Sequence, residues 1–320
     1  MKLTRYTEKL RNLAEYYFRE EKALSTTQRC CVSLKKNELS IVCIDHHADM
    51  NNVLLLEKFK YDEIKSLPLI MGGVVKQYQL TQTPVYWLLE PDDYQLNLIE
   101  SMPVPKNEFK TALKWRIHSL INYPIDETVM ESFELPAKKN SPQSPLIAAV
   151  TAQKVKLANT LNIFKDCRFN LVSINIPELV MLNLSALHES DEKSTAFLYF
   201  FEREIIFNIS NRKTLYFTRR INIPFSHTSV IDYEALSLEI LRYFDFFRSQ
   251  WRLASPTRII VATDNENVQD AAKVLTERLM NPVEMYVLGS TILDEKRRAE
   301  ISGSYLLNYG CLLKQSNNHV

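Results

Sequence analysis

Two segments of this chain carry the same pattern of apolar runs separated by short polar turns. The runs are 28–34, 38–45 and 52–60 in the first segment, and 195–201, 204–210 and 214–221 in the second. They are rich in Val, Ile, Leu, Phe and Tyr, and the breaks carry Asn, Asp, Lys or Glu. Apolar runs broken by turn residues predict strands joined by hairpins. The sequence therefore predicts one three-stranded meander in each half of the chain.

Each meander is followed by helical periodicity and then by strands and helices in alternation. In the first half the predicted helices are 61–79, 153–164 and 178–188, and the strands are 84–90, 146–150 and 169–176. In the second half one predicted helix follows Asp232, a second follows Asp264 or Asn265, and a third covers 294–313. The predicted strands there are 258–263 and 283–288. Pro68 and the pair Gly72-Gly73 are expected to break the first helix. The repeated order predicts two similar α/β domains.

A segment of about 91–136 interrupts the first half and has no counterpart in the second. It contains a predicted strand at 96–101 and a half-buried strand at 128–135. Between them, an apolar stripe predicts a helix that follows Pro105. The segment is therefore expected to form a small strand-helix-strand subdomain. The predicted division is an N-terminal helix over 1–27, a first domain over 28–190 and a second domain over 191–320.

Composition limits the function classes. A chain of 320 residues exceeds what one core usually organises. The net charge of +1 argues against a nucleic-acid binder with a broad basic face. No apolar stretch approaches the roughly 20 residues that span a bilayer, and no signal peptide is evident, so a cytoplasmic protein is expected. Only five residues are glycine, where ordinary usage gives about 22.

The five cysteines have no paired metal-ligand spacing. An odd number without a CxxC motif favours reduced, buried thiols over a disulfide framework. Cys30 and Cys43 would meet across the first hairpin, and buried thiols are the preferred interpretation there too. The run Asp45-His46-His47-Ala48-Asp49 is interpreted as a solvated hairpin, because no further ligands complete a metal site. No metal is therefore expected.

The inserted segment has the most specific motif. Residues 99–117 read IESMPVPKNEFKTALKWRI, and residues 120–127 read LINYPIDE. This stretch resembles the PilM and MshI family of type IV pilus (MSHA) biogenesis proteins, in which a proline-flanked entry precedes a helix with a basic-Trp-basic centre and an aromatic-Pro turn. The resemblance implies an actin-like (ribonuclease H-like) fold of duplicated α/β domains.

The same resemblance implies a function. It predicts a cytoplasmic adaptor, peripherally associated with the inner membrane, that docks onto the cytosolic N-terminus of a PilN-like inner-membrane protein. Through that platform the adaptor would also connect to the motor ATPase. A cytosolic component of type II secretion with the same fold is an alternative.

Nucleotide binding depends on two hairpin turns of the actin-like fold. Backbone amides can approach a phosphate only where no side chain intrudes, so glycine is needed there. The first turn instead offers Lys35 and Lys36, and the second offers Glu202 and Glu204. Two carboxylates near a phosphate position also repel it. We therefore expect no ATP or Mg²⁺ cofactor and a pseudo-ATPase, the alternative being a nucleotide-binding switch or ATPase with diverged turns.

Five residues in and before the insert are predicted to bind the partner segment: Tyr86, Trp87, Trp115, Arg116 and Tyr123. An extended peptide can pair with a sheet edge while aromatic pockets fix its register. Trp115 lies off the apolar stripe of its helix, so it would face a partner. The alternative is that Trp115 packs under the insert's own sheet.

Overall fold

The computed structural model describes residues 27–47, 50–138, 145–188, 193–223, 231–264, 268, 270–289 and 295–313. Apart from residue 27, the helix predicted over 1–27 lies outside the described residues. The chain divides into two compact units. The second unit contains 135–145 and 178–306, and the first contains the remainder, including 307–313. This division differs from the predicted boundary at 190/191, because residues 178–188 belong to the second unit. The segment 135–145 also belongs to the second unit, and the chain returns to the first unit near its end.

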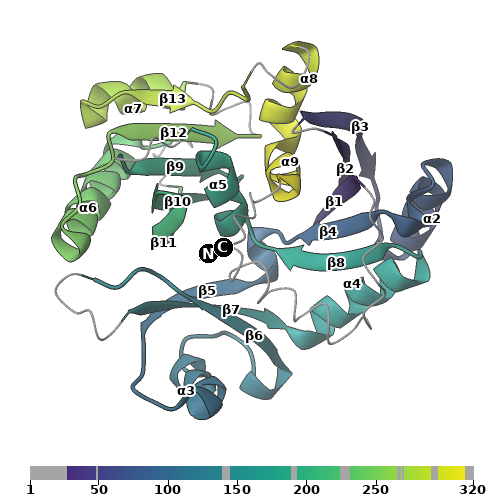
Figure 1. The fold of residues 1–320 in the computed structure, drawn as a ribbon, viewed down its shortest axis with the longest axis horizontal. Helices are drawn as coiled ribbons and strands as arrows, with labels where there is room; N and C mark the ends of the chain where they lie inside the picture. Colours follow the sequence, from purple (N-terminus) through teal and green to yellow (C-terminus); the bar gives the residue numbers. More distant parts are fainter. Residues whose placement is uncertain are drawn as a thin grey trace. The chain divides into compact units, whose positions relative to one another are not determined.

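The first unit is built on a five-stranded sheet (Figure 1). Its strands are β1 (Gln28–Lys35), β2 (Glu38–His47), β3 (Met50–Lys60), β4 (Pro84–Leu88) and β8 (Asn170–Asn175). The spatial order is β3-β2-β1-β4-β8. The meander pairs antiparallel, and β4 joins β1 in parallel, as does β8 to β4.

The second unit repeats this design. Its strands are β9 (Thr195–Phe200), β10 (Glu204–Asn211), β11 (Thr214–Asn222), β12 (Arg258–Thr263) and β13 (Val283–Met285). The order is β11-β10-β9-β12-β13, with the same directions as in the first sheet. The duplicated α/β architecture predicted from the two meanders is confirmed.

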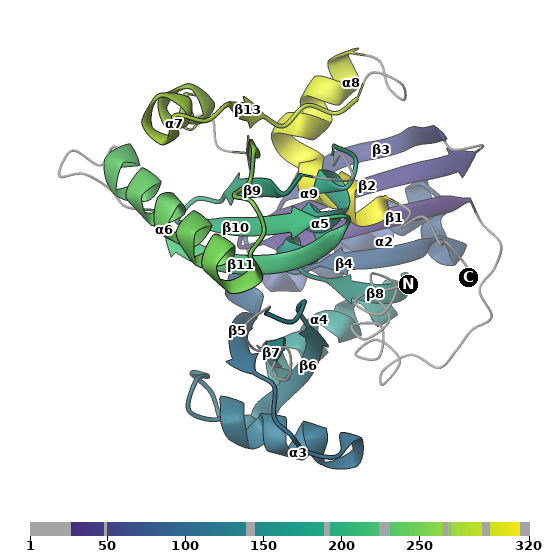
Figure 2. The same cartoon turned by 60° about the vertical axis from the view of Figure 1, so that its left-hand side comes forward.

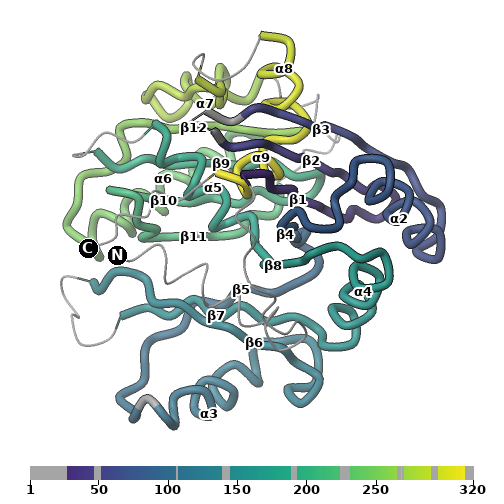
Figure 3. The backbone as a smooth tube through the Cα atoms, turned by 45° about the vertical axis from the view of Figure 1, so that its right-hand side comes forward, coloured from purple at the N-terminus to yellow at the C-terminus, as the bar shows by residue number. Residues whose placement is uncertain are grey.

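Helices cover the sheets in each unit. The first unit has α2 (Leu67–Gln77), α3 (Lys106–Ile117), α4 (Lys154–Asp166) and α9 (Leu306–Leu312). The second has α5 (Pro177–Ser185), α6 (Tyr233–Trp251), α7 (Ala271–Leu279), α8 (Glu295–Glu300) and the π-helical Ile301–Tyr305. Helix α2 packs beside α4 (Figure 3). Asp232 caps α6 by accepting bonds from the amides of Glu234 and Ala235, as its sequence position predicts.

Of the two predicted breaks in the first helix, only the one at the glycine pair is wrong. The α-helix does not extend over 61–66 but begins at Leu67, with Pro68 in the first turn of α2, where its missing N–H costs nothing. Gly72 and Gly73 lie inside α2 and continue it. A helix tolerates internal glycine at a cost of about 1 kcal/mol each, so the glycine pair weakens α2 without ending it.

The inserted subdomain is larger than predicted. It contains β5 (Gln95–Glu100), α3, β6 (Thr128–Glu134) and β7 (Leu146–Gln153), and its sheet has the order β5-β7-β6. The central strand β7 comes from beyond the predicted limit at 136. Every residue of β7 except the last is buried, so it has no polar face. A continuous apolar run does not reveal which sheet a strand joins, which explains the miss.

Candidate functional site

The first of the two turns connects β1 and β2. The side chain of Lys36 is exposed at the tip of this turn, and the backbones of Lys35 and Glu38 lie opposite each other where the two strands end. The Tyr61 hydroxyl donates to the carbonyl of Lys35, and the Tyr61 amide donates to Asn37 over 3.1 Å. Burial, with the charges of two nearby carboxylates, raises the pKa of Tyr61, so this donor stays protonated at neutral pH. The turn is thus fixed and has no glycine.

The second turn connects β9 and β10 and closes with a 2.8 Å bond from the Phe201 amide to the Glu204 carbonyl. Glu202 is exposed at the tip. Arg220 of β11 lies with Nη1 at 3.6 Å from Glu204 Oε1 and Nε at 3.3 Å from Glu178 Oε1. Glu178, at the start of α5, is 1% exposed.

This arrangement corrects the sequence-based electrostatics of the second turn. Glu204 was counted as a charge that repels phosphate, but Arg220 offsets it. Only Glu202 is a carboxylate at the exposed tip. The steric part of the argument does not depend on this pairing, because both turns carry side chains where a phosphate cradle needs bare backbone. Nucleotide binding remains a question of shape more than of charge.

The five residues predicted to bind a partner do not come together. Trp87 is 3% exposed and packs against Phe164 of α4, with ring centroids 5.5 Å apart. Its side chain belongs to the core. Tyr86 points to the opposite face of β4 and is half-buried, opposite Ser173 of the outer strand β8.

The remaining three residues lie in the inserted subdomain. Tyr123 is half-buried and its hydroxyl donates to Thr151 of β7 over 2.9 Å. Burial raises the pKa of Tyr123, which keeps the donor protonated. Trp115 is 78% exposed and Arg116 is exposed, both on α3. Of the two alternatives for Trp115, packing under the insert's sheet is therefore wrong.

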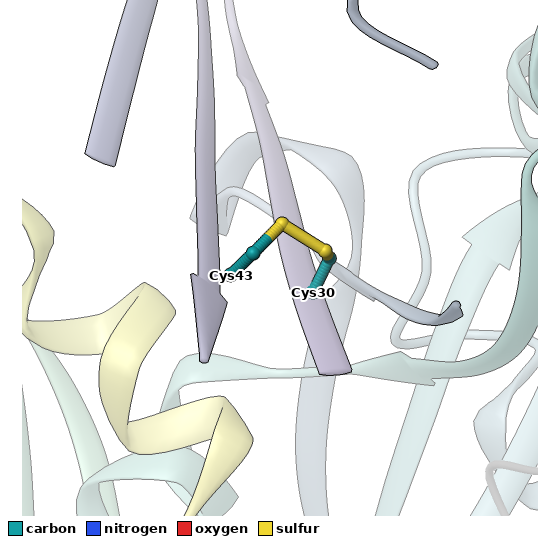
Figure 4. Close-up of a disulfide and its surroundings, with 2 residues drawn as sticks. All are labelled: Cys30 and Cys43. Carbon is teal, nitrogen blue, oxygen red and sulfur yellow. A yellow bond between two sulfur atoms is a disulfide. The ribbon is translucent and has the colours of Figure 1, made fainter. Parts of the chain in front are cut away.

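The cysteines of the first hairpin also differ from expectation. Cys30 and Cys43 are buried and form a disulfide across β1 and β2, with Cα atoms 4.1 Å apart (Figure 4). The prediction of buried thiols is wrong for this pair, because directly opposed positions of an antiparallel pair place Cβ atoms within bonding reach. Cys31, Cys167 and Cys311 are free and buried. Burial raises the pKa of Cys31 well above its ordinary value, and the neighbouring Cys311 adds to this.

Within the residues that the structure places, no group of three His, Cys, Asp or Glu side chains lies together as metal ligands. Residues 48 and 49 of the His-containing hairpin lie outside that part. No helix in the described part of the chain combines the length and apolarity needed to cross a bilayer.

Comparison with known proteins identifies the class of fold. No family model and no curated protein sequence matches the chain. Among solved structures, a chain of the PilM–PilN type IV pilus biogenesis complex is similar over 88% of this chain and 97% of that chain, with a TM-score of 0.68 and 14% identity. A Bacteroides thetaiotaomicron protein with an actin-like ATPase fold and unknown function is similar over 82% and 91%, with a TM-score of 0.52 and 8% identity.

A third similar structure is the cytoplasmic domain of EpsL, an inner membrane component of the type II secretion system of Vibrio cholerae. The similarity extends over 91% of this chain and 97% of that domain, with a TM-score of 0.50 and 14% identity. Identities this low concern the fold and not the activity. The chain has the actin-like ATPase fold.

Proposed function

We propose that this protein is a cytoplasmic adaptor of type IV pilus assembly, of the MSHA type, that is peripherally associated with the inner membrane. It would bind the cytosolic N-terminal segment of a PilN-like inner-membrane protein and, through that platform, connect to the motor ATPase. The observation that carries the proposal is the similarity to a chain of the PilM–PilN complex, which extends over nearly the whole of both chains. The motif in 99–127 supports it independently.

The site proposed for the partner segment is the outer edge of β8. This strand ends the order β3-β2-β1-β4-β8, so its outer backbone groups can pair with an added strand. Tyr86 lies on the adjacent strand and provides an aromatic contact next to that edge. Tyr123, in the turn after α3, remains a candidate and is held by its hydrogen bond to Thr151 of β7, whereas Trp87 is assigned to the core.

The experiment is a binding titration of the full chain with a synthetic peptide of the partner's cytosolic N-terminus. We expect saturable binding, weakened at least tenfold in Tyr86→Ala because truncated aromatic anchors dominate interface energies. Equal thermal midpoints of wild type and variant would exclude misfolding as the cause. The double variant Trp115→Ala with Arg116→Ala tests whether α3 belongs to the site. Unchanged peptide affinity would exclude the exposed side of α3 from the peptide site. Absence of binding by the wild type would refute the proposal.

The second candidate function is a nucleotide-dependent switch of the same machinery. It is favoured by the fold alone, which it shares with the actin-like ATPases. Thermal titration with Mg-ATP separates the two functions, because a ligand of the native state raises its apparent stability. We expect no shift, since neither turn leaves its backbone amides bare. A saturable shift at micromolar nucleotide would replace the adaptor proposal with the switch. A preference for a type II secretion partner over the pilus partner would support the EpsL-like alternative.

A further inference from the structure

The inserted subdomain presents one face of α3 to its own sheet. Helix α3 lies beside the sheet that contains β6 and β7 (Figure 2). Leu113 and Ile117 are 1% and 0% exposed and pack with Ile99 of β5 and Ile147 of β7. Successive residues of a helix are about 100° apart, so Trp115 lies about 200° from Leu113 and projects on the other side. Its 78% exposure agrees with this geometry. The fold of the insert thus makes no use of the Trp115 side chain.

The exposed side of α3 is basic. The helix KNEFKTALKWRI carries four cations and one anion, Glu108, although the whole chain has a net charge of only +1. Lys114 and Arg116, which flank Trp115, are exposed and form no ion pair with any residue that the structure describes. Lys110 lies one turn before Lys114, and its ammonium is 3.9 Å from Glu131 of β6. By the same spacing, Lys114 and Arg116 project about 100° to either side of Trp115, and Lys110 projects about 140° from it. These four residues therefore span the solvent side of the helix, and long cationic side chains can bend toward one surface. We call Lys110, Lys114, Trp115 and Arg116 the α3 basic face.

We propose that the α3 basic face contacts an anionic phospholipid surface. A protein partner's hot spot usually clusters several large side chains, commonly Trp, Tyr and Arg, in desolvated pockets. Here one indole stands on a convex helix between unpaired cations, and the exposed neighbours on the helix include the polar Asn107 and Thr111. Tryptophan is favoured at the headgroup level of a membrane, and lysine and arginine are attracted to anionic headgroups. Charge complementarity and surface shape therefore favour lipid over an acidic peptide.

The contact is expected to be weak on its own. Each cation close to an anionic surface strengthens binding roughly fivefold, so three cations and one indole give a supporting contact and not a stable anchor. This inference does not require the proposed partner segment. Vesicle binding without peptide binding, or the reverse, would show which of the two proposals fails.

The protein contains its own probe for the experiment. Of its three tryptophans, Trp87 and Trp251 are each 3% exposed, so a change in indole environment on membrane contact reports Trp115. The full chain is titrated with phosphatidylcholine vesicles that contain phosphatidylglycerol, and with pure phosphatidylcholine vesicles. We expect a blue shift of emission and co-sedimentation with the anionic vesicles only, both reduced by added salt. Trp115→Phe should lose the spectral shift.

Charge variants identify the surface. Lys110→Ala with Lys114→Ala and Arg116→Ala should weaken binding to the anionic vesicles on the order of 100-fold. Lys154→Ala with Lys165→Ala removes two exposed cations from α4 and serves as the control for lost charge, with much less expected loss per charge removed. Equal losses in the two variants, or no binding of the wild type to anionic vesicles, would overturn the proposal. A blue shift with polyglutamate but none with vesicles would assign the α3 basic face to an acidic protein segment and would also overturn it.

Discussion

The two hairpins that start the two halves lie at matching positions and share one kind of ion pair, but they differ in their further contacts. In the first, Lys58 of β3 lies opposite Ser40 and its ammonium is 3.2 Å from Glu38. In the second, Arg220 of β11 lies opposite Ile206 and reaches Glu204. Glu38 and Glu204 both begin the second strand of their meander. A cation on the third strand paired with an acid at the start of the second is thus common to both halves.

The difference lies in what each cation reaches next. Arg220 also contacts the buried Glu178 at the start of α5, whereas the ammonium of Lys58 contacts Glu38. The guanidinium fork can serve two carboxylates, and an ammonium is a point charge. The second turn is therefore connected electrostatically to a helix, and the first turn is an ordinary surface hairpin with an ion pair.

The halves differ again at one cross-strand pair. In the first meander, Cys30 faces Cys43. The pair at the same distance from the turn in the second meander is Ala196 and Ile209. The same topology thus accommodates a covalent link or an apolar contact. The disulfide is an addition of the first half and not a requirement of the fold.

The largest expected effect concerns this disulfide. Replacing the pair by the residues of the second half, Cys30→Ala with Cys43→Ile, should lower the free energy of unfolding of the oxidised protein by about 3 kcal/mol, because the link closes a short loop with a sequence separation of 13. Denaturant unfolding with and without dithiothreitol measures it. Wild type should lose this increment on reduction, and the variant should not respond.

The compartment determines when that increment exists. A reducing compartment such as the cytosol would break the link, so the increment is expected only of the oxidised protein. If the variant and wild type respond equally to reduction, the effect comes from elsewhere and the comparison of the two hairpins loses its covalent part.

A smaller effect is expected at the ion pairs. Arg220→Ala should cost about 2 kcal/mol, because it leaves the carboxylate of Glu178 buried without its cation, and the partial exposure of Arg220 reduces the usual penalty. Lys58→Ala should cost less than about 1 kcal/mol, since its pair is more exposed. Denaturant midpoints of the two variants give the comparison.

The double variant Arg220→Ala with Glu178→Gln controls for the mechanism. It should recover part of the loss, because the amide of glutamine is less costly to bury than a carboxylate that has lost its cation. Equal costs for Arg220→Ala and Lys58→Ala would mean that Glu178 is not the source of the difference between the two hairpins.

These contrasts also show how far sequence reasoning reaches. Apolar runs bounded by polar turns located the meanders, and the cap at Asp232 located α6, because each signal is local. The pairing of Arg220 with Glu178 joins residues 42 positions apart, and nothing near either residue announces it. The same holds for β7, whose uniform burial does not reveal which sheet it joins. It also holds for the separation of Tyr86 on β4 from Trp115 and Arg116 on α3. Tertiary placement decided these features.

The smallest expected effect compares the first helix of each half. Helix α2 contains Gly72 and Gly73, whereas α6, which follows the second meander, contains no glycine. A Cβ built on either glycine meets no atom within 4 Å, so the fold gives no packing reason for them. Gly73→Ala should therefore stabilise the protein by up to about 1 kcal/mol, through the lower conformational entropy of the unfolded chain and the better helix propensity of alanine. A rise in the thermal midpoint measures it, with Ala235→Gly on the exposed side of α6 as the reverse control. A fall in the midpoint of Gly73→Ala would show that α2 has a requirement for bare backbone that α6 lacks.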